Sequence, residues 1–237
     1  MMNLHNHTTY SNGLFSPDMI IDYAVKSGLE YVGLCDTFGS KKISDASTLE
    51  TYIEDIKKYA LLNPNPKIKV LVGLEIDTSS EETMQLYHDL PIHLVNRLDY
   101  LLFENVQDDE KNGMPFFQLI NERKRVSVPI GLAHNDISRN FTDVNQDNLI
   151  SVLESDRIFI ELNDSPKYMK LSKPYYFFAD TFFRKIRIRD VMLSIGTDTY
   201  DVLDEVGAVK EAYNFVERMG LQRNLITKLW SRKTVEK

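Results

Sequence analysis

The chain has 237 residues, a length that fits one large domain or two small ones. Its formal net charge is -7 and 43% of its residues are hydrophobic, so a nucleic-acid partner is disfavoured and a chain disordered throughout is excluded. The single cysteine, Cys35, cannot form an internal disulfide, and no apolar run approaches the roughly 20 residues of a membrane span, so we expect a cytoplasmic protein without a membrane partner.

Seven short runs rich in aliphatic and β-branched residues are predicted to be strands. Most of them are apolar throughout, which is typical of strands that are buried on both faces of a parallel sheet. In chain order they cover residues 2–7, 31–36, 68–75, 100–104, 129–134, 158–163 and 191–198.

Segments with helix signals alternate with these strands. The clearest of these segments covers residues 19–27. Ser16 can cap this helix, Pro17 suits its first position, and Gly28 ends it. The alternation indicates βα units with right-handed crossovers and a parallel sheet, either doubly wound and open or closed into a barrel. No linker divides the chain, so we expect one domain over residues 1–237. The other predicted helices cover residues 46–60, 81–97, 115–125, 145–154, 174–187 and 203–219.

Residue types that bind metal ions stand at the C-terminal ends of most predicted strands. In a parallel barrel these ends share one face, where barrel enzymes hold their active sites. His5 and His7 are two residues apart on one strand, so both imidazoles can reach one ion. Glu75 ends an almost wholly apolar strand, where an unpaired carboxylate is costly. The set comprises His5, His7, Asp36, Glu75, His134, Glu161 and Asp198.

Six short motifs occur in order along the chain. They are HNH at residues 5–7 followed by TTYSNG, GLEYVGLCD at 28–36, VGLE at 72–75, GLAH at 131–134 and GTD at 196–198. This ordered set resembles the PHP superfamily, the polymerase and histidinol phosphatase type of metal-dependent phosphoesterase, from residue 2 to about residue 224. The resemblance implies a distorted (βα)7 barrel with up to three metal ions at its C-terminal rim, hydrolysing phosphate esters.

By position, the resemblance implies a first metal site whose four ligands are all present. Glu75 of this set would also bridge to a second ion, which His134 helps to bind. The second ion's other histidine is missing, because Val106 or Gln107 stands at its position after the fourth strand. The ligands of the first site would be His5, His7, Glu75 and Asp198.

The positions that would hold a third ion are all altered. They carry Asn12, Thr37 and Tyr200, none of which is a histidine. Amide, hydroxyl and phenol groups bind Zn or Mn poorly unless ionised, and tyrosine at its ordinary pKa of about 10 stays protonated at neutral pH. We therefore expect one or two divalent ions, of Zn, Mn or Fe, and a Tyr200 that donates a hydrogen bond to a substrate phosphate oxygen or to a metal-bound water.

The predicted activity is metal-dependent hydrolysis of a small phosphomonoester, as in a histidinol phosphatase, with Glu75, Asp198 and Tyr200 in catalysis. Phosphate recognition needs positive charge, and Lys41 and Arg139 near strand ends are the candidates. The alternative is a PHP-type barrel that has lost catalysis and serves as a binding or scaffold protein. The complete first site argues for the enzyme, and the missing histidines argue for the alternative. The sequence names neither the substrate nor the oligomeric state.

Overall fold

A computed structural model of the chain describes residues 1–231 and contains a parallel sheet of seven strands in chain order. Each of the seven predicted runs contributes one strand, although the first, fifth and last strands are shorter than predicted. The strands are β1 (Met2–Asn3), β2 (Tyr31–Thr37), β3 (Lys69–Asp77), β4 (Tyr100–Glu104), β5 (Ile130–Leu132), β6 (Ile158–Asn163) and β9 (Leu193–Gly196).

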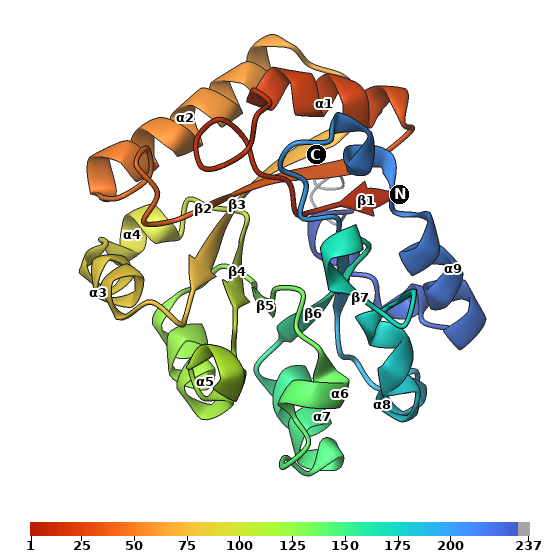
Figure 1. Cartoon of the computed structure of the whole chain (residues 1–237). Helices are drawn as coiled ribbons and strands as arrows, with labels where there is room; N and C mark the ends of the chain where they lie inside the picture. The colour runs from red at the N-terminus through yellow and green to blue at the C-terminus, as the bar shows by residue number, and fades with distance from the viewer. Residues whose placement is uncertain (232–237) are drawn as a thin grey trace, which may run out of the picture.

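The sheet curls until its first and last strands meet. The Leu4 amide donates to the Ile195 carbonyl at 2.8 Å, and a parallel bridge joins Asn6 to Thr199. Helices cover the outside of the resulting ring of strands, as Figure 1 shows. The fold is therefore the nearly closed, distorted (βα)7 barrel that the family resemblance implied, and the doubly wound open sheet was the wrong alternative.

The helices follow the predicted order, but three of the predicted helices differ and two short helices, 137–140 and 228–231, were not predicted. The predicted helix 203–219 begins as a 3₁₀ turn over Leu203–Gly207 and is α-helical only over Lys210–Met219. The predicted helix 81–97 is interrupted at Pro91, which has no amide hydrogen to continue a helix. The predicted helix 174–187 begins as a 3₁₀ turn over Tyr175–Ala179. The α-helices are α1 (Pro17–Lys26), α2 (Ala46–Leu62), α3 (Glu81–Asp89), α4 (Ile92–Val95), α5 (Phe116–Arg125), α6 (Ile137–Asn140), α7 (Gln146–Ser155), α8 (Asp180–Ile186), α9 (Lys210–Met219) and α10 (Lys228–Ser231).

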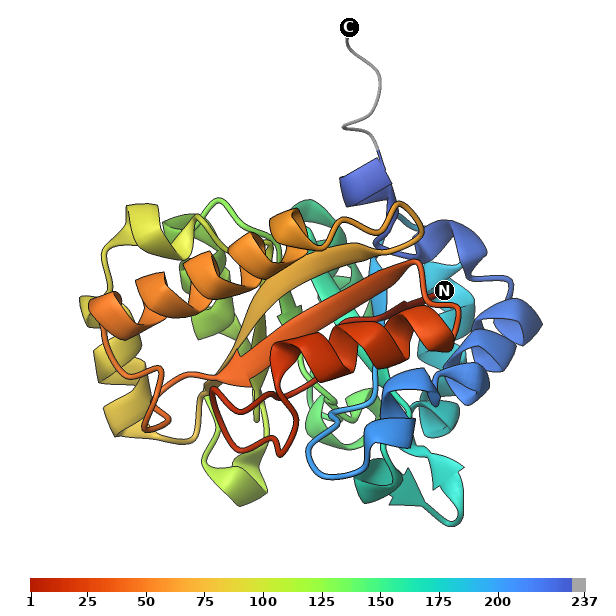
Figure 2. The same cartoon turned by 90° about the horizontal axis from the view of Figure 1, so that it is seen from above.

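A short hairpin after β6 was not predicted. It consists of β7 (Met169–Lys170) and β8 (Lys173–Pro174), which pair antiparallel. In Figure 2 the hairpin projects from one end of the barrel and α10 lies toward the other end. Among the helices of residues 1–231, none combines the length and the hydropathy that a membrane crossing requires.

Aromatic rings fill the middle of the barrel below the strand ends. Tyr100 and Phe159 are fully buried and meet edge to face, with ring centroids 6.4 Å apart. Two neighbouring strands carry glycines against the Tyr100 ring. A Cβ atom at Gly33 would lie 2.1 Å from the Tyr100 hydroxyl, and one at Gly73 would lie 2.3 Å from its Cζ atom. Both glycines are needed for this ring to fit.

Candidate metal centre

His5 and His7 extend beyond β1, and both side chains point into the barrel. Both are completely buried, with ring centroids 5.1 Å apart. The Nε2 atom of His7 lies 3.0 Å from Oδ1 of Asp198, and Nε2 of His5 lies 3.6 Å from the same oxygen. The two imidazoles therefore face one carboxylate from the last strand, as the alternation along the first strand predicted.

Glu75, on β3, lies between three imidazole rings. Its Oε1 atom is 3.1 Å from Nε2 of His5 and 3.2 Å from Nε2 of His134, and its Oε2 atom is 3.5 Å from Nε2 of His7. Burial alone would raise the pKa of Glu75, but the facing His5 and His134 rings hold it well below its ordinary value. The structure thus brings the predicted bridging carboxylate to the centre of the site.

Two groups of potential ligands share Glu75. The ligand atoms of His5, His7 and Glu75 all lie within 4.8 Å of one another, and so do those of Glu75, Glu104 and His134. Among the described residues 1–231, the Nε2 atom of His5 is buried and has no hydrogen-bond partner. A buried ring nitrogen beside carboxylate oxygens fits a metal ion, because imidazole and carboxylate are the usual ligands of Zn and related ions.

Glu161, at the end of β6, orients two of the imidazole residues. Its Oε1 atom lies 2.9 Å from Nδ1 of His5, and its Oε2 atom accepts a 2.7 Å hydrogen bond from the His134 amide. Burial lowers the pKa of His5, but the carboxylates of Glu161 and Glu75 raise it well above its usual value. With Nδ1 of His5 held by Glu161, Nε2 is left to face the centre, as in a carboxylate–histidine–metal arrangement.

Tyr168 links Asp198 to His134, and Lys167 contacts Asp198 and Tyr200; neither Tyr168 nor Lys167 was singled out from the sequence. The Tyr168 hydroxyl donates to Oδ2 of Asp198 at 2.7 Å, while its ring stacks on His134 with centroids 4.3 Å apart. Nζ of Lys167 lies 3.5 Å from the same Oδ2 atom and 3.7 Å from the centre of the Tyr200 ring. Both residues belong to a short 3₁₀ turn after β6, Pro166–Tyr168, whose position periodicity does not predict.

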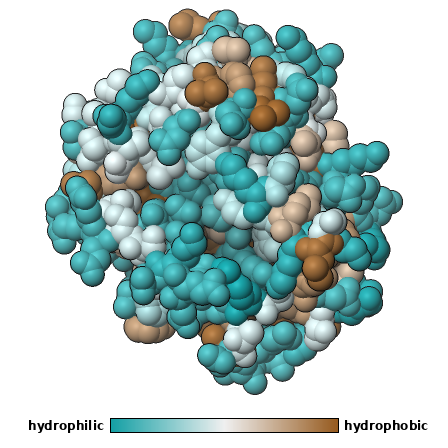
Figure 3. Space-filling view, in the orientation of Figure 1, coloured by the Kyte–Doolittle hydropathy of each residue, from teal (hydrophilic) through white to brown (hydrophobic). Residues whose placement is uncertain are grey.

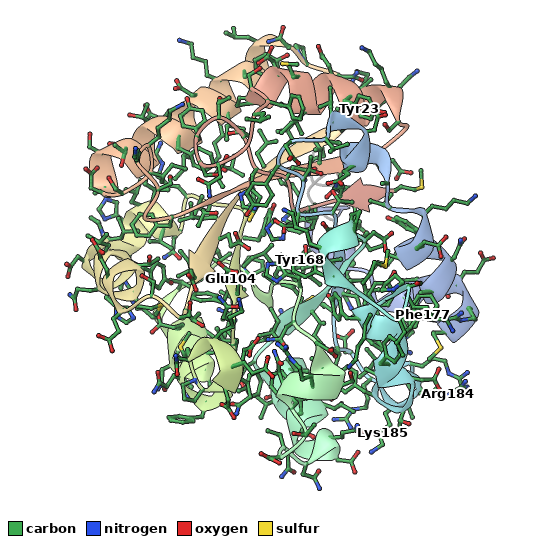
Figure 4. All side chains as sticks on the ribbon, in the orientation of Figure 1. Tyr23, Glu104, Tyr168, Phe177, Arg184 and Lys185 are labelled. Carbon is green, nitrogen blue, oxygen red and sulfur yellow. The ribbon has the colours of Figure 1, made fainter. Side chains whose placement is uncertain are left out.

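Glu104 is a potential metal ligand that the sequence interpretation overlooked. Its Oε2 atom lies 3.8 Å from Nε2 of His134. Burial, together with the nearby Glu75 carboxylate, raises the pKa of Glu104 to about 8. Of the two residues that stood at the missing histidine's position, Val106 is fully buried and Gln107 accepts a hydrogen bond from the Phe116 amide at the start of α5. In Figure 4, Glu104 and Tyr168 both lie inside the ring of helices.

The three altered third-site positions lie in different surroundings. Asn12 is exposed on the loop after β1. The Thr37 hydroxyl donates to Oε2 of Glu75 at 3.2 Å, and Tyr200 stacks on His7 with ring centroids 4.0 Å apart. Thr37 and Tyr200 therefore contact the predicted ligands.

Asp36, next to these positions, is engaged with the loop after β1. It is fully buried, and it accepts hydrogen bonds from the Thr8 amide at 2.7 Å, the Thr8 hydroxyl at 2.7 Å and the Ser11 hydroxyl at 2.5 Å. These donors belong to the segment that follows His7, so Asp36 fixes the loop that carries the second predicted imidazole.

A cleft of 420 Å³ opens beside His134 and Glu104. Arg139 lines it and forms ion pairs with Asp108 and, at 3.1 Å, with Glu110. Lys41 is exposed on the loop after β2 and does not line this cleft. Figure 3 shows hydrophilic side chains around a hollow near the middle of this face. The structure thus brings one of the two predicted phosphate-binding cations to the cleft next to the ligand groups.

A family model and one curated relative match this sequence. The PHP domain model matches residues 3–147, more than half of the chain, so the chain belongs to the PHP domain family. The DNA polymerase/3'-5' exonuclease PolX of Bacillus subtilis (strain 168) is 22% identical over 201 residues, which are 84% of this chain. The chain spans only 34% of the length of that relative.

Two solved structures share the fold. Histidinol phosphate phosphatase (HISK) from Lactococcus lactis subsp. lactis Il1403, in complex with zinc, L-histidinol and phosphate, aligns with a TM-score of 0.61 and 15% identity over 93% of this chain and 94% of its own. A second structure, of the metal-dependent tyrosine phosphatases YwqE from Bacillus subtilis and CpsB from Streptococcus pneumoniae, aligns with a TM-score of 0.59 and 16% identity. The alignment covers 94% of this chain and 90% of the other. These matches confirm the barrel.

Proposed function

We propose that the protein is a metal-dependent phosphoesterase that hydrolyses a small phosphomonoester. One observation carries the proposal: two groups of imidazole and carboxylate ligands share Glu75, and a buried His5 ring nitrogen beside them has no hydrogen-bond partner within the part of the chain that the structure describes. Barrel enzymes place their catalytic groups at this end of the strands.

The predicted ligands divide between the two groups. His5, His7 and Asp198 would hold a first ion, His134 would hold a second, and Glu75 would contribute to both. To the predicted set we add Glu104 as a ligand of the second ion. When bound, such ions polarise phosphoryl oxygens and activate water as a nucleophile. The chain's own part is to fix these ligands, through Glu161 on His5 and Tyr168 on Asp198.

The cleft supports a small phosphorylated substrate. Its volume of 420 Å³ lies in the range of about 300–1,000 Å³ typical of small-molecule sites. Arg139 and Lys170 line it, and Lys167 lies at the Asp198 side of the site. We propose that Arg139 and Lys167 supply positive charge to the substrate phosphate, since charge-assisted hydrogen bonds recognise phosphate oxygens. Lys41, the other cation predicted for this role, is exposed and does not line the cleft, so it is not part of this proposal. The zinc, L-histidinol and phosphate named for the L. lactis neighbour are consistent with this substrate class.

Metal content and phosphatase activity together test the proposal. We expect protein purified without chelator to carry one to two equivalents of transition metal, and to hydrolyse p-nitrophenyl phosphate faster when Zn²⁺ or Mn²⁺ is added and not at all after chelation. Elemental analysis that finds no metal, with no uptake of Zn²⁺ or Mn²⁺ on titration, would refute the phosphoesterase and leave the binding or scaffold protein as the better hypothesis.

The Tyr200→Phe substitution tests the proposed role of this hydroxyl. Loss of one donor aimed at developing phosphoryl charge should lower the rate by a factor on the order of ten to a hundred, while metal content stays unchanged. The phenylalanine ring keeps the stacking on His7. Tyr59→Phe, on α2 outside the barrel, is the control for loss of a phenol and should leave both quantities unchanged. If Tyr200→Phe strips an ion from the protein, Tyr200 is a ligand and not a donor.

A further inference from the structure

The two ligand groups differ in the atoms that they offer. Asp198 Oδ1 lies 3.0 Å from Nε2 of His7, so we count Asp198 with His5, His7 and Glu75 in the first group, which then has two imidazoles and two carboxylates. The second group, Glu75, Glu104 and His134, has one imidazole and two carboxylates. Imidazole suits Zn²⁺, and carboxylate suits Mn²⁺ and Mg²⁺. The second group should therefore favour Zn²⁺ over Mn²⁺ less strongly than the first.

The two groups also differ in their access to solvent. In the first group the side chains of His5 and His7 are 0% exposed, and that of Asp198 is 2% exposed. In the second group His134 is 10% exposed and Glu104 is 23% exposed, and both line the 420 Å³ cleft. None of the first group's residues lines this cleft. Solvent thus reaches the second group directly.

The third difference is in the hydrogen bonds that hold the ligands. In the first group, Glu161 binds Nδ1 of His5 and Tyr168 binds Oδ2 of Asp198. Within residues 1–231, no protein donor hydrogen-bonds to the Glu104 carboxylate. Each such outer contact is typically worth about 10–100-fold in metal affinity. Glu161 also binds the His134 amide, so the support that the second group lacks is the one at Glu104.

We propose that the two groups form unequal ion positions: the first retains Zn²⁺, and the second exchanges its ion through the cleft and accepts Mn²⁺. This inference rests on the proposed function, in which both groups are ligands. Composition, exposure and outer hydrogen bonds all point in the same direction, and Glu104 accounts for much of each difference.

A metal-exchange experiment on the whole protein tests whether the two ion positions differ. The protein is loaded with two equivalents of Zn²⁺, dialysed against excess Mn²⁺, and assayed for both metals by elemental analysis and for bound Mn²⁺ by electron paramagnetic resonance. We expect one Zn²⁺ and one Mn²⁺ per chain, with the exchanged Zn²⁺ leaving at least about tenfold faster than the retained one. Retention of both Zn²⁺ ions, or loss of both at the same rate, would overturn the proposal.

Two substitutions at Glu104 locate the exchanging ion. Glu104→His should slow the exchange until both Zn²⁺ ions are retained, because it supplies a second imidazole to that group. Glu104→Gln should lower Zn²⁺ binding to one equivalent, which is retained. Asp108→Asn removes a different carboxylate from the same cleft and should leave the metal pattern of the wild type. Wild-type exchange in both Glu104 variants would contradict the assignment.

The result of the metal-exchange experiment can be distinguished from the result of the phosphatase assay that tests the proposed function. Hydrolysis of p-nitrophenyl phosphate by a protein whose two ions exchange together would support the phosphoesterase and overturn the unequal positions. Exchange of one ion by a protein that hydrolyses no phosphate ester would support the unequal ion positions and contradict the phosphoesterase.

Discussion

Addition of Zn²⁺ is expected to raise the melting temperature of the wild-type protein by about 8–16 °C, and His7→Ala is expected to abolish most of this rise. A ligand that binds only the native state at about 1,000 times its Kd stabilises it by about 4 kcal/mol, and each kcal/mol shifts the melting temperature of a chain of this size by about 2–4 °C. His7 is fully buried and faces Asp198 at 3.0 Å, so its loss removes a ligand from the first group. Calorimetry with and without metal measures the rise within each variant.

The chain offers a matched control for this experiment. His88, on α3, also faces a carboxylate, with Nε2 2.9 Å from Oε1 of Glu122, but it lies outside the barrel centre. His88→Ala should keep the full metal-dependent rise even if it changes the melting temperature without metal. An undiminished rise in His7→Ala would show that the stabilising ion binds elsewhere.

Glu75→Gln is expected to lower the rate of phosphate ester hydrolysis by a factor of at least about 1,000. That factor corresponds to about 4 kcal/mol of transition-state stabilisation, at about 1.36 kcal/mol for each factor of ten. Glutamine keeps the shape of Glu75 but removes the charge that both ligand groups share. Steady-state kinetics with p-nitrophenyl phosphate, on protein with metal in excess, measures the effect.

Glu122→Gln is the control for Glu75→Gln. Glu122 is also buried, and it binds His88 and Arg125 away from the barrel centre. This variant should keep the wild-type rate. Equal rates in the wild type and in Glu75→Gln would mean that the observed hydrolysis came from a contaminating phosphatase.

Sequence patterns predicted the strands and much of the candidate site for a physical reason. Buried parallel strands must be apolar along their length, so a polar residue such as Glu75 at the end of such a strand stands out. The residues that come together at Glu75, among them His5 and His134, all lie at strand ends, where the barrel brings them to one rim.

The parts that the sequence did not predict depend on the three-dimensional path of the chain. Tyr168 reaches Asp198 from a short 3₁₀ turn between β6 and β7, and no periodicity describes that contact. Glu104 closes the fourth predicted strand and could have been found from its position alone. The family resemblance places the second ion's other ligand beyond this strand end instead, at residues 106–107. The interruption of the predicted helix 81–97 at Pro91 could also have been predicted from the sequence, because proline disrupts a helix interior.

The buried rings of Tyr100 and Phe159 fill the interior of the barrel below the ligand groups. Both rings have 0% exposure and lie below the ligand groups, with Gly33 and Gly73 letting Tyr100 seat tightly between the strands. The cleft at the rim gives access to the ligand groups, so a bulky group bound there would hinder both the entry and the release of ions and substrate.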